Sequence, residues 1–225
     1  MLKNTFVILA ALAFLGTTAD AAGVNGATVS KDKLTTQARP GSSHYVPAPP
    51  PSRMDTIFSN IGTKYPNGLY FCCFGNTISG PNSLIGQTIW NAVQFTPEGD
   101  ATIKEIDSAV ALASGNNRIV LNIAEDNGGV PGNVLGSFPV SGAMGAFGDC
   151  CQLVTTAAHI RVTGGTPYWF FISTDDQSAN TWAAWPYNST DQVNTLNGAG
   201  YDGSSWTAFG PGRPAVSFAL YGKLH

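Results

Sequence analysis

The chain has 225 residues, of which only 11% are charged, with 11 lysines and arginines against 14 aspartates and glutamates. An average globular protein carries about 25% charged residues, so most of this surface must be built from neutral polar side chains. A net charge of -3 without a basic cluster after the leader argues against a nucleic-acid partner. The 26 glycines favour short strands and turns over long helices.

Residues 1–21 have the pattern of a secretory signal peptide. Lys3 gives the positive start, 6–15 is an unbroken apolar run, and Ala19-Asp20-Ala21 ends in small residues suited to cleavage. The apolar run has about half of the ~20 residues that a membrane-spanning helix needs. We therefore expect a secreted, extracellular protein without a membrane span.

Residues 22–54 are expected to form a flexible linker. The stretch is rich in glycine, serine and threonine, and 46–51 (Val-Pro-Ala-Pro-Pro-Pro) favours an extended polyproline conformation. Few of its side chains could contribute to a core. We therefore place the folded domain at 55–225.

Strands and turns alternate through the domain. Ile119, Leu121 and Ile123 share one face at the period of two that defines a strand, and 215–221 alternates in the same way. The segment 168–172 (Tyr-Trp-Phe-Phe-Ile) is apolar on both faces and should be a central strand. Further strands are expected at 56–60, 69–74, 88–95, 102–112, 134–140, 159–162, 181–185 and 205–209. About ten short strands without a helical period predict an all-β fold, a two-sheet, jelly-roll-like antiparallel β-sandwich.

The four cysteines form two adjacent pairs, Cys72-Cys73 and Cys150-Cys151. In an oxidising compartment they predict disulfides, and two of the three possible pairings join the first pair to the second. Two vicinal bridges are the least favoured pairing, because they strain the peptide between the cysteines. Since neighbouring strand residues point to opposite faces, one pair should lie in a loop or bulge. A four-cysteine zinc site is disfavoured by the adjacent spacing.

Four segments of the domain resemble the choice-of-anchor R domain, a family of bacterial extracellular β-sandwiches. They are 93–97 with 103–106; 120–135; 165–172; and 182–187 with 216–221. The most specific part is the run 126–132 (Asp-Asn-Gly-Gly-Val-Pro-Gly). The resemblance covers about 56–222 and implies an exported, non-enzymatic module. The two cysteine pairs and the lack of an anchoring tail depart from the family pattern.

Catalytic signatures are weak, so we expect no enzyme activity. The sequence has no Gly-x-Ser-x-Gly elbow and no zinc-protease helix motif. The aromatic residues of the last third are the stronger signal, because Trp182, Trp185 and Trp206 stand among polar residues. Flat rings beside amides and hydroxyls suit sugar rings, and the alternative is that these side chains cover sandwich edges. The expected ligand-binding set is Trp182, Trp185, Tyr187, Trp206 and Asp202.

No cofactor is expected, and calcium is the weaker alternative, with loop oxygens from Asp126, Asn127, Asp175, Asp176 and Asp202 as its ligands. The predicted function is extracellular recognition of a polysaccharide or another cell-surface component. The alternative is a structural matrix or envelope protein that acts through protein–protein contacts.

Overall fold

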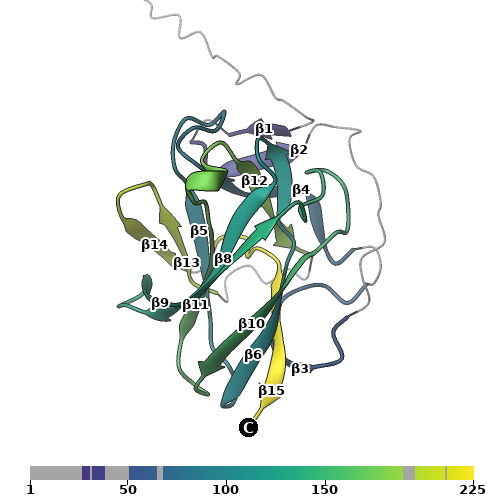
Figure 1. Ribbon diagram of the computed structural model, residues 1–225, viewed down its shortest axis with the longest axis vertical. Coiled ribbons are helices and arrows are strands. Elements are labelled where there is room, and N and C mark those ends of the chain that lie inside the picture. Colours follow the sequence, from purple (N-terminus) through teal and green to yellow (C-terminus); the bar gives the residue numbers. More distant parts are fainter. Residues whose placement is uncertain (1–26, 31, 39–50, 65–67, 190–195, 211) are drawn as a thin grey trace, which may run out of the picture.

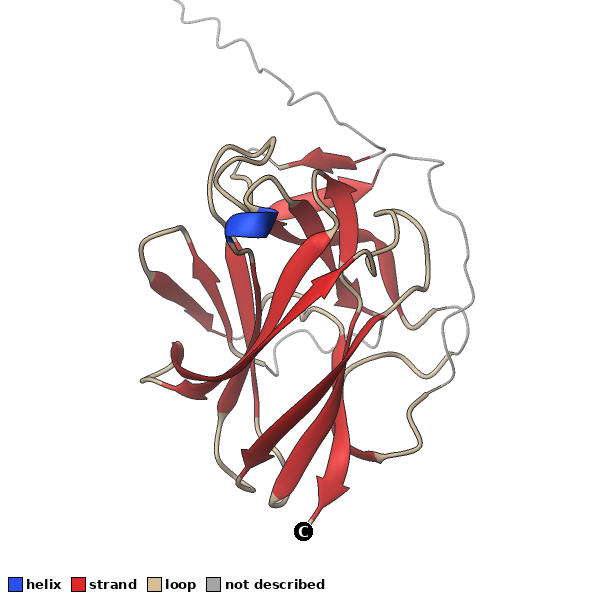
Figure 2. Cartoon of the chain, viewed as in Figure 1, coloured by secondary structure: helices blue, strands red, loops and turns tan. Residues whose placement is uncertain are grey.

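The computed structural model describes residues 27–30, 32–38, 51–64, 68–189, 196–210 and 212–225. These residues form fifteen strands and one short 3-10 helix, η1 (Asp176–Ser178), as Figures 1 and 2 show. The strands lie in three antiparallel sheets of six, four and five strands. Among the described residues, no helix is both long and apolar enough to cross a membrane.

The six-stranded sheet has the order β14-β13-β5-β11-β8-β9. Its strands are β5 (Trp90–Phe95), β8 (Arg118–Asp126), β9 (Pro131–Ser141), β11 (Tyr168–Ser173), β13 (Gly198–Tyr201) and β14 (Trp206–Gly210). The central strand β11 is buried along its whole length, as its apolar sequence predicts. On β8, Ile119, Leu121 and Ile123 all point into the main core, which confirms the alternation.

Two smaller sheets complete the fold. The four-stranded sheet has the order β10-β6-β15-β3, and the five-stranded sheet has the order β1-β2-β4-β12-β7. Their strands are β1 (Ala27–Val29), β2 (Thr35–Ala38), β3 (Asp55–Ser59), β4 (Tyr70–Ser79), β6 (Ala101–Ser108), β7 (Ala111–Ser114), β10 (Val154–Val162), β12 (Trp182–Asn188) and β15 (Phe218–Leu224). Only Ala109 and Val110 separate β6 from β7, so the chain passes directly from the four-stranded into the five-stranded sheet.

One apolar core joins all three sheets. It includes Phe170 from the six-stranded sheet, Ile106 and Phe218 from the four-stranded sheet, and Ile78 and Trp185 from the five-stranded sheet. Aromatic rings cross between the sheets, because the centroid of Phe170 lies 4.7 Å from that of Phe218 and 5.2 Å from that of Trp185. The fold is therefore all-β and sandwich-like, as the alternation predicts.

The strand number is larger than the sequence suggests. The described residues hold fifteen strands in three sheets, whereas the pattern predicts about ten in two. The expected strand 102–112 is two strands, β6 and β7, that belong to different sheets. The glycine-containing strand β13 has too little apolar alternation to be found by pattern, and it is held by main-chain pairing to β5 and β14.

Part of the expected linker belongs to the folded domain, which corrects the boundary at residue 55. The strands β1 and β2 form a hairpin, and β2 pairs with β4 in the five-stranded sheet. Ala27 and Thr36 are fully buried. The segment has few large apolar side chains, so its main-chain hydrogen bonds and small buried residues hold it in place. The predicted signal peptide, and 39–50 of the expected linker, lie outside the described residues.

The structure brings three of the four cysteines together. Cys72 and Cys150 form a disulfide with a Cα–Cα distance of 5.6 Å, and the Sγ of Cys151 is also at bonding distance from that of Cys150. One sulfur forms one disulfide, so these two bonds are alternatives. Cys73 points to the opposite face of β4, where it packs against a separate cluster that contains Trp182. Cys150 and Cys151 lie between β9 and β10, outside any named strand, which agrees with the expectation of a loop for one pair.

Candidate functional site

Three half-buried aromatic side chains stand side by side on the outer face of the six-stranded sheet. Trp90 on β5 lies opposite Tyr201 on β13, and Tyr201 lies opposite Trp206 on β14. The ring centroids of Trp90 and Tyr201 are 4.4 Å apart with an interplanar angle of 17°, and those of Tyr201 and Trp206 are 5.4 Å apart. We call these three residues the aromatic row. In Figure 1 their strands are at the left side of the molecule.

The row sits on a buried apolar floor. Ala92, Phe171 and Ala199 form a small cluster on this face of the sheet, and Trp206 packs against it. The ring of Trp206 meets that of Phe171 at 75°, with 5.2 Å between centroids. The alanines leave room for large rings above them. The floor therefore fixes Trp206 in place, while all three rings of the row remain partly open to solvent.

A hydrogen bond to the residue that follows β11 holds the first ring of the row. The indole Nε1 of Trp90 donates to Oγ1 of Thr174, at 3.0 Å. Both chain neighbours of Thr174 make side-chain contacts with β8. The Oγ of Ser173 accepts a hydrogen bond from Nδ2 of Asn122 at 2.9 Å, and Asp175 forms an ion pair with Arg118. Both neighbours are thus fixed to β8, and this fixes the position of Thr174.

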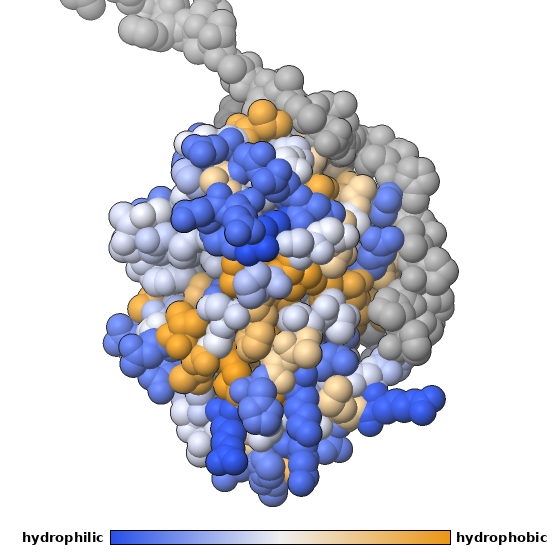
Figure 3. Space-filling view, in the orientation of Figure 1, coloured by the Kyte–Doolittle hydropathy of each residue, from blue (hydrophilic) through white to orange (hydrophobic). Residues whose placement is uncertain are grey.

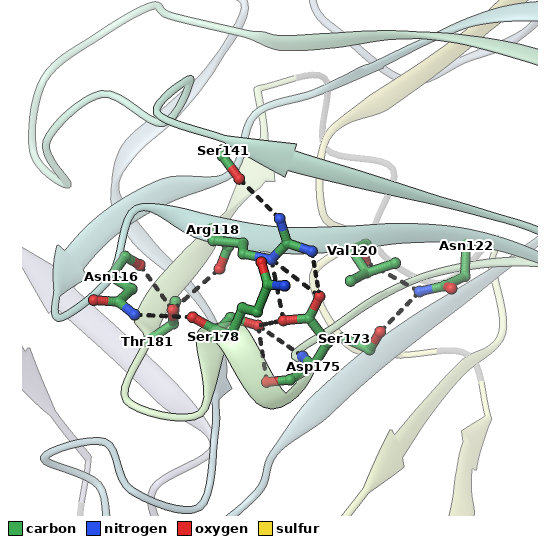
Figure 4. Close-up of polar contacts among 10 residues, drawn as sticks. Asn116, Arg118, Val120, Asn122, Ser141, Ser173, Asp175, Ser178 and Thr181 are labelled. Atoms are coloured by element: carbon green, nitrogen blue, oxygen red, sulfur yellow. Dashed lines mark hydrogen bonds and ion pairs between the residues drawn. The ribbon is translucent and has the colours of Figure 1, made fainter.

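Figure 4 shows the polar network around Asp175. The Arg118 guanidinium donates to both carboxylate oxygens of Asp175, at 2.6 to 3.2 Å, and to Oγ of Ser141 at 3.0 Å. Hydrogen bonds from Arg118 and Ser178 lower the pKa of the Asp175 carboxyl to about 2. Thr181 donates to the main-chain oxygens of Asn116 and Arg118. The network joins β8, β9 and η1, and its role is structural support for the loop after β11.

A groove lies beside the row, on the other face of the β13–β14 hairpin. Its cavity volume is about 160 Å³. Its lining combines apolar and polar side chains: Leu34, Gln87, Ile89, Asn91, Gly200, Tyr201, Asp202, Thr207 and Phe209. Tyr201 and Asp202 border the groove and also lie at the hairpin end of the aromatic row. The two features therefore lie on opposite faces of the hairpin and meet at its turn, at Tyr201 and Asp202.

Asp202 shapes the hairpin turn. Its Oδ1 accepts hydrogen bonds from the main-chain N–H groups of Ser204 and Ser205 and from the hydroxyl of Ser204, at 2.7 to 3.0 Å. These bonds, that from the Ser204 hydroxyl above all, lower the pKa of the Asp202 carboxyl to about 2. The group is therefore ionised at neutral pH and is exposed to solvent. It can accept a hydrogen bond from a ligand hydroxyl through Oδ2.

The structure places the predicted binding residues on two separate elements, the β13–β14 hairpin and β12. It brings Trp206 and Asp202 together on the β13–β14 hairpin. Trp182 and Trp185 are only 3% and 0% exposed, so the prediction that they bind a ligand at the surface is wrong. Both lie on the covered strand β12, and their indole N–H groups are satisfied inside, by Thr36 and by the main-chain oxygen of Ser217. Tyr187 is half-buried on the same strand, and its hydroxyl donates to Asn76.

Sequence reasoning missed Trp90 as a site residue. The signal was present in the alternation of 88–95, because Val93 and Phe95 must face the core and Trp90 then faces outward with Ala92 and Gln94. Tyr201 could only be placed through its register with Trp90. That pairing depends on a strand which the pattern did not reveal.

Three of the carboxylates considered for calcium, those of Asp126, Asp175 and Asp202, already accept hydrogen bonds from the protein. Asp126 takes the indole N–H of Trp169 at 2.7 Å and the side-chain amide of Gln94 at 2.9 Å, and Asp175 is bound to Arg118. Among the described residues, one group of three potential metal ligands lies close together: Cys72, Cys150 and Cys151. That group coincides with the disulfide. The carboxylate arrangement therefore adds no support to the calcium alternative.

The chain matches no protein-family model, no curated protein and no solved structure. Fold and site together define the molecule as a β-sandwich-like protein with an aromatic surface beside a groove.

Proposed function

We propose that this protein is a secreted, non-catalytic module that binds carbohydrate at the aromatic row and the adjacent groove. The observation that carries the proposal is the row itself, three rings from three neighbouring strands that remain partly open to solvent on a rigid floor. A large, rigid aromatic surface costs little conformational entropy when a ligand binds, since each ring has only two side-chain torsions. We also propose that the protein is secreted and that it is related to the choice-of-anchor R domains that its sequence resembles.

The polar groups around the row suit a sugar. The apolar faces of sugar rings stack on aromatic side chains, and their hydroxyls need donors and acceptors near the edge of the stack. Asp202 supplies an acceptor at the turn where the row and the groove meet, and Gln87 and Thr207 supply donors and acceptors along the groove. An ionised carboxylate at Asp202 forms stronger hydrogen bonds than a neutral acceptor would. Apolar rings bordered by a few placed polar groups are typical of small-molecule sites.

A glycan array with the mature protein, followed by titration calorimetry with the best oligosaccharide, tests this function. We expect saturable binding that Trp90→Ala and Trp206→Ala each weaken about tenfold or more, corresponding to about 1.4 kcal/mol. Phe71→Ala is the matched control, because Phe71 is an aromatic residue 48% exposed on β4, outside the site. Its affinity should equal that of the parent.

Two results would count against the proposal. Folded Trp90 and Trp206 variants that bind like the parent would place the sugar elsewhere. Absence of glycan binding together with concentration-dependent self-association would favour the alternative, a structural matrix or envelope protein acting through protein–protein contacts. Sedimentation velocity of the same samples measures the self-association.

A further inference from the structure

A second pocket lies on the outer face of the four-stranded sheet, away from the aromatic row. Its floor is Asp107 on β6, Tyr221 on β15 and Ser59 on β3. The walls come from segments that rise above the sheet: Pro51, Ile61, Gly62, Thr63, Leu69 and Leu153. The cavity volume is about 290 Å³, which is close to the lower end of known ligand pockets at ~300 Å³.

A carboxylate in such a place is unusual. Asp107 is only 5% exposed, and burying an ionised group is costly unless it is paired. Oδ1 of Asp107 accepts the hydroxyl of Thr155 at 2.6 Å. No donor to Oδ2 is found among the residues that the structure describes. Half of the acceptor capacity of a buried carboxylate therefore remains unused beside a cavity.

The described residues that line the Asp107 pocket include no lysine, arginine or histidine, so they supply no compensating positive charge. Burial raises the pKa of the Asp107 carboxyl to about 6, and the negative charge of Glu105 acts in the same direction. Burial likewise raises the pKa of Tyr221 to about 12, so its hydroxyl stays neutral. At neutral pH the pocket thus combines a mostly ionised carboxylate with neutral hydroxyls.

The walls are mostly apolar and well supported. Ile61, Leu69 and Leu153 pack against Cys150 and Cys151 in a separate apolar cluster. The Cys72–Cys150 disulfide joins β4 to the same region. A covalent bond therefore ties the walls to β4 of the five-stranded sheet, and the pocket is preformed rather than assembled around a ligand.

We propose that the Asp107 pocket binds a small organic cation, a primary ammonium group attached to an apolar body of a few carbons. The ammonium group has three N–H donors, which match Oδ2 of Asp107 and the hydroxyl oxygens of Tyr221 and Ser59. Its positive charge supplies the partner that the buried carboxylate lacks. The carbon body fits the walls of Ile61, Leu69 and Leu153.

The test compares two probes of nearly the same shape, cyclohexylmethylamine and the neutral alcohol cyclohexylmethanol. Each is titrated into the full mature protein at pH 7.5 while amide chemical shifts are followed by ¹H–¹⁵N NMR. We expect the amine to bind at least tenfold more tightly than the alcohol. The shifts should cluster at Ser59, Asp107, Thr155 and Tyr221.

Variants separate the pocket from other surface charges. Asp107→Asn keeps an acceptor for Thr155 and the same shape, so it should fold normally, and it should reduce the preference for the amine to less than threefold. Leu153→Trp fills the cavity and should weaken both probes. Glu98→Gln, at an exposed carboxylate outside this pocket, is the matched control and should change nothing.

Three results would overturn the proposal: no saturable amine binding to the parent, equal binding of amine and alcohol, or an amine preference that persists in folded Asp107→Asn. The readout is independent of the carbohydrate proposal. Trp90→Ala and Trp206→Ala should leave amine binding unchanged, even if the glycan experiment fails.

Discussion

At the residue scale, burial decides what each polar or aromatic side chain can do. Trp185 and Trp206 stand in similarly polar sequence surroundings, yet Trp185 is fully buried and Trp206 is half-buried. The difference lies in the face, because Trp185 points into the main core between the sheets, whereas Trp206 stands on the outer face of the six-stranded sheet. The residues adjacent in the sequence therefore do not indicate whether a tryptophan is buried.

Asp107 gives a prediction for the pH dependence of stability. The folded state has a carboxyl pKa of about 6, above the value of about 3.9 in an unfolded chain. The folded protein therefore binds this proton more tightly, and the contribution of Asp107 to stability falls as the pH rises from about 4 to 6. Relative to the parent, Asp107→Asn should gain about 1–3 kcal/mol in unfolding free energy across this range. Urea unfolding at pH 4, 5, 6 and 7 measures it, and a constant difference would refute the effect.

The Arg118–Asp175 pair predicts a pH dependence of stability opposite in sign to that of Asp107. Hydrogen bonds from Arg118 hold the pKa of Asp175 near 2, below its unfolded value. The stabilisation is present above about pH 4 and is lost as the pH falls toward 2. Asp175→Asn should therefore lower stability at pH 6 and have a smaller effect at pH 2. Circular dichroism melts at both pH values check this, and Asp176→Asn, one residue along, is the control.

At the element scale, the β1–β2 hairpin depends on a small buried polar cluster. Oγ1 of Thr36 lies 3.0 Å from Oγ1 of Thr77 and accepts the indole N–H of Trp182 at 3.0 Å. The three groups connect β2, β4 and β12 across the five-stranded sheet. Specific hydrogen bonds thus attach a hairpin that has few large apolar side chains.

Thr36→Val should lower the free energy of unfolding, because it removes the central member of that cluster. Valine has nearly the same shape but leaves the Trp182 N–H without its acceptor, and an unsatisfied buried donor costs about 1–3 kcal/mol. We expect a loss of this size in urea unfolding. Hydrogen exchange should also become faster in β1 and β2. Thr28→Val, whose hydroxyl makes only a long 3.4 Å contact, should be nearly neutral.

At the scale of the whole molecule, an apolar band extends over the surface between two hydrophilic ends (Figure 3). The large apolar side chains most exposed on β9 are Val134 and Leu135. Beneath this surface, the core shared by the three sheets and the Cys72–Cys150 disulfide stabilise the fold.

Removing the disulfide should therefore have a large effect. The bond closes a loop with a sequence separation of 78 residues, for which loop-closure entropy gives about 4–5 kcal/mol. Cys72→Ser should lose most of this, whereas Cys151→Ser keeps the bond between Cys72 and Cys150 and should lose much less. Urea unfolding measures both, and peptide mapping without reduction identifies the bond. Equal losses would show that Cys150 pairs with Cys151 instead.

By itself, the sequence determined the all-β class, most of the strands and the inward faces of β8 and β15, because alternation and turn residues act over a few positions. It also placed Trp206 and Asp202 in the expected ligand-binding set, and their binding role stays a prediction. The tertiary structure decided which tryptophans are covered, that 27–38 belongs to the fold, and that Trp90 and Tyr201 stand next to Trp206. These outcomes depend on strand pairing between segments far apart in the chain, and local patterns carry no information about such register.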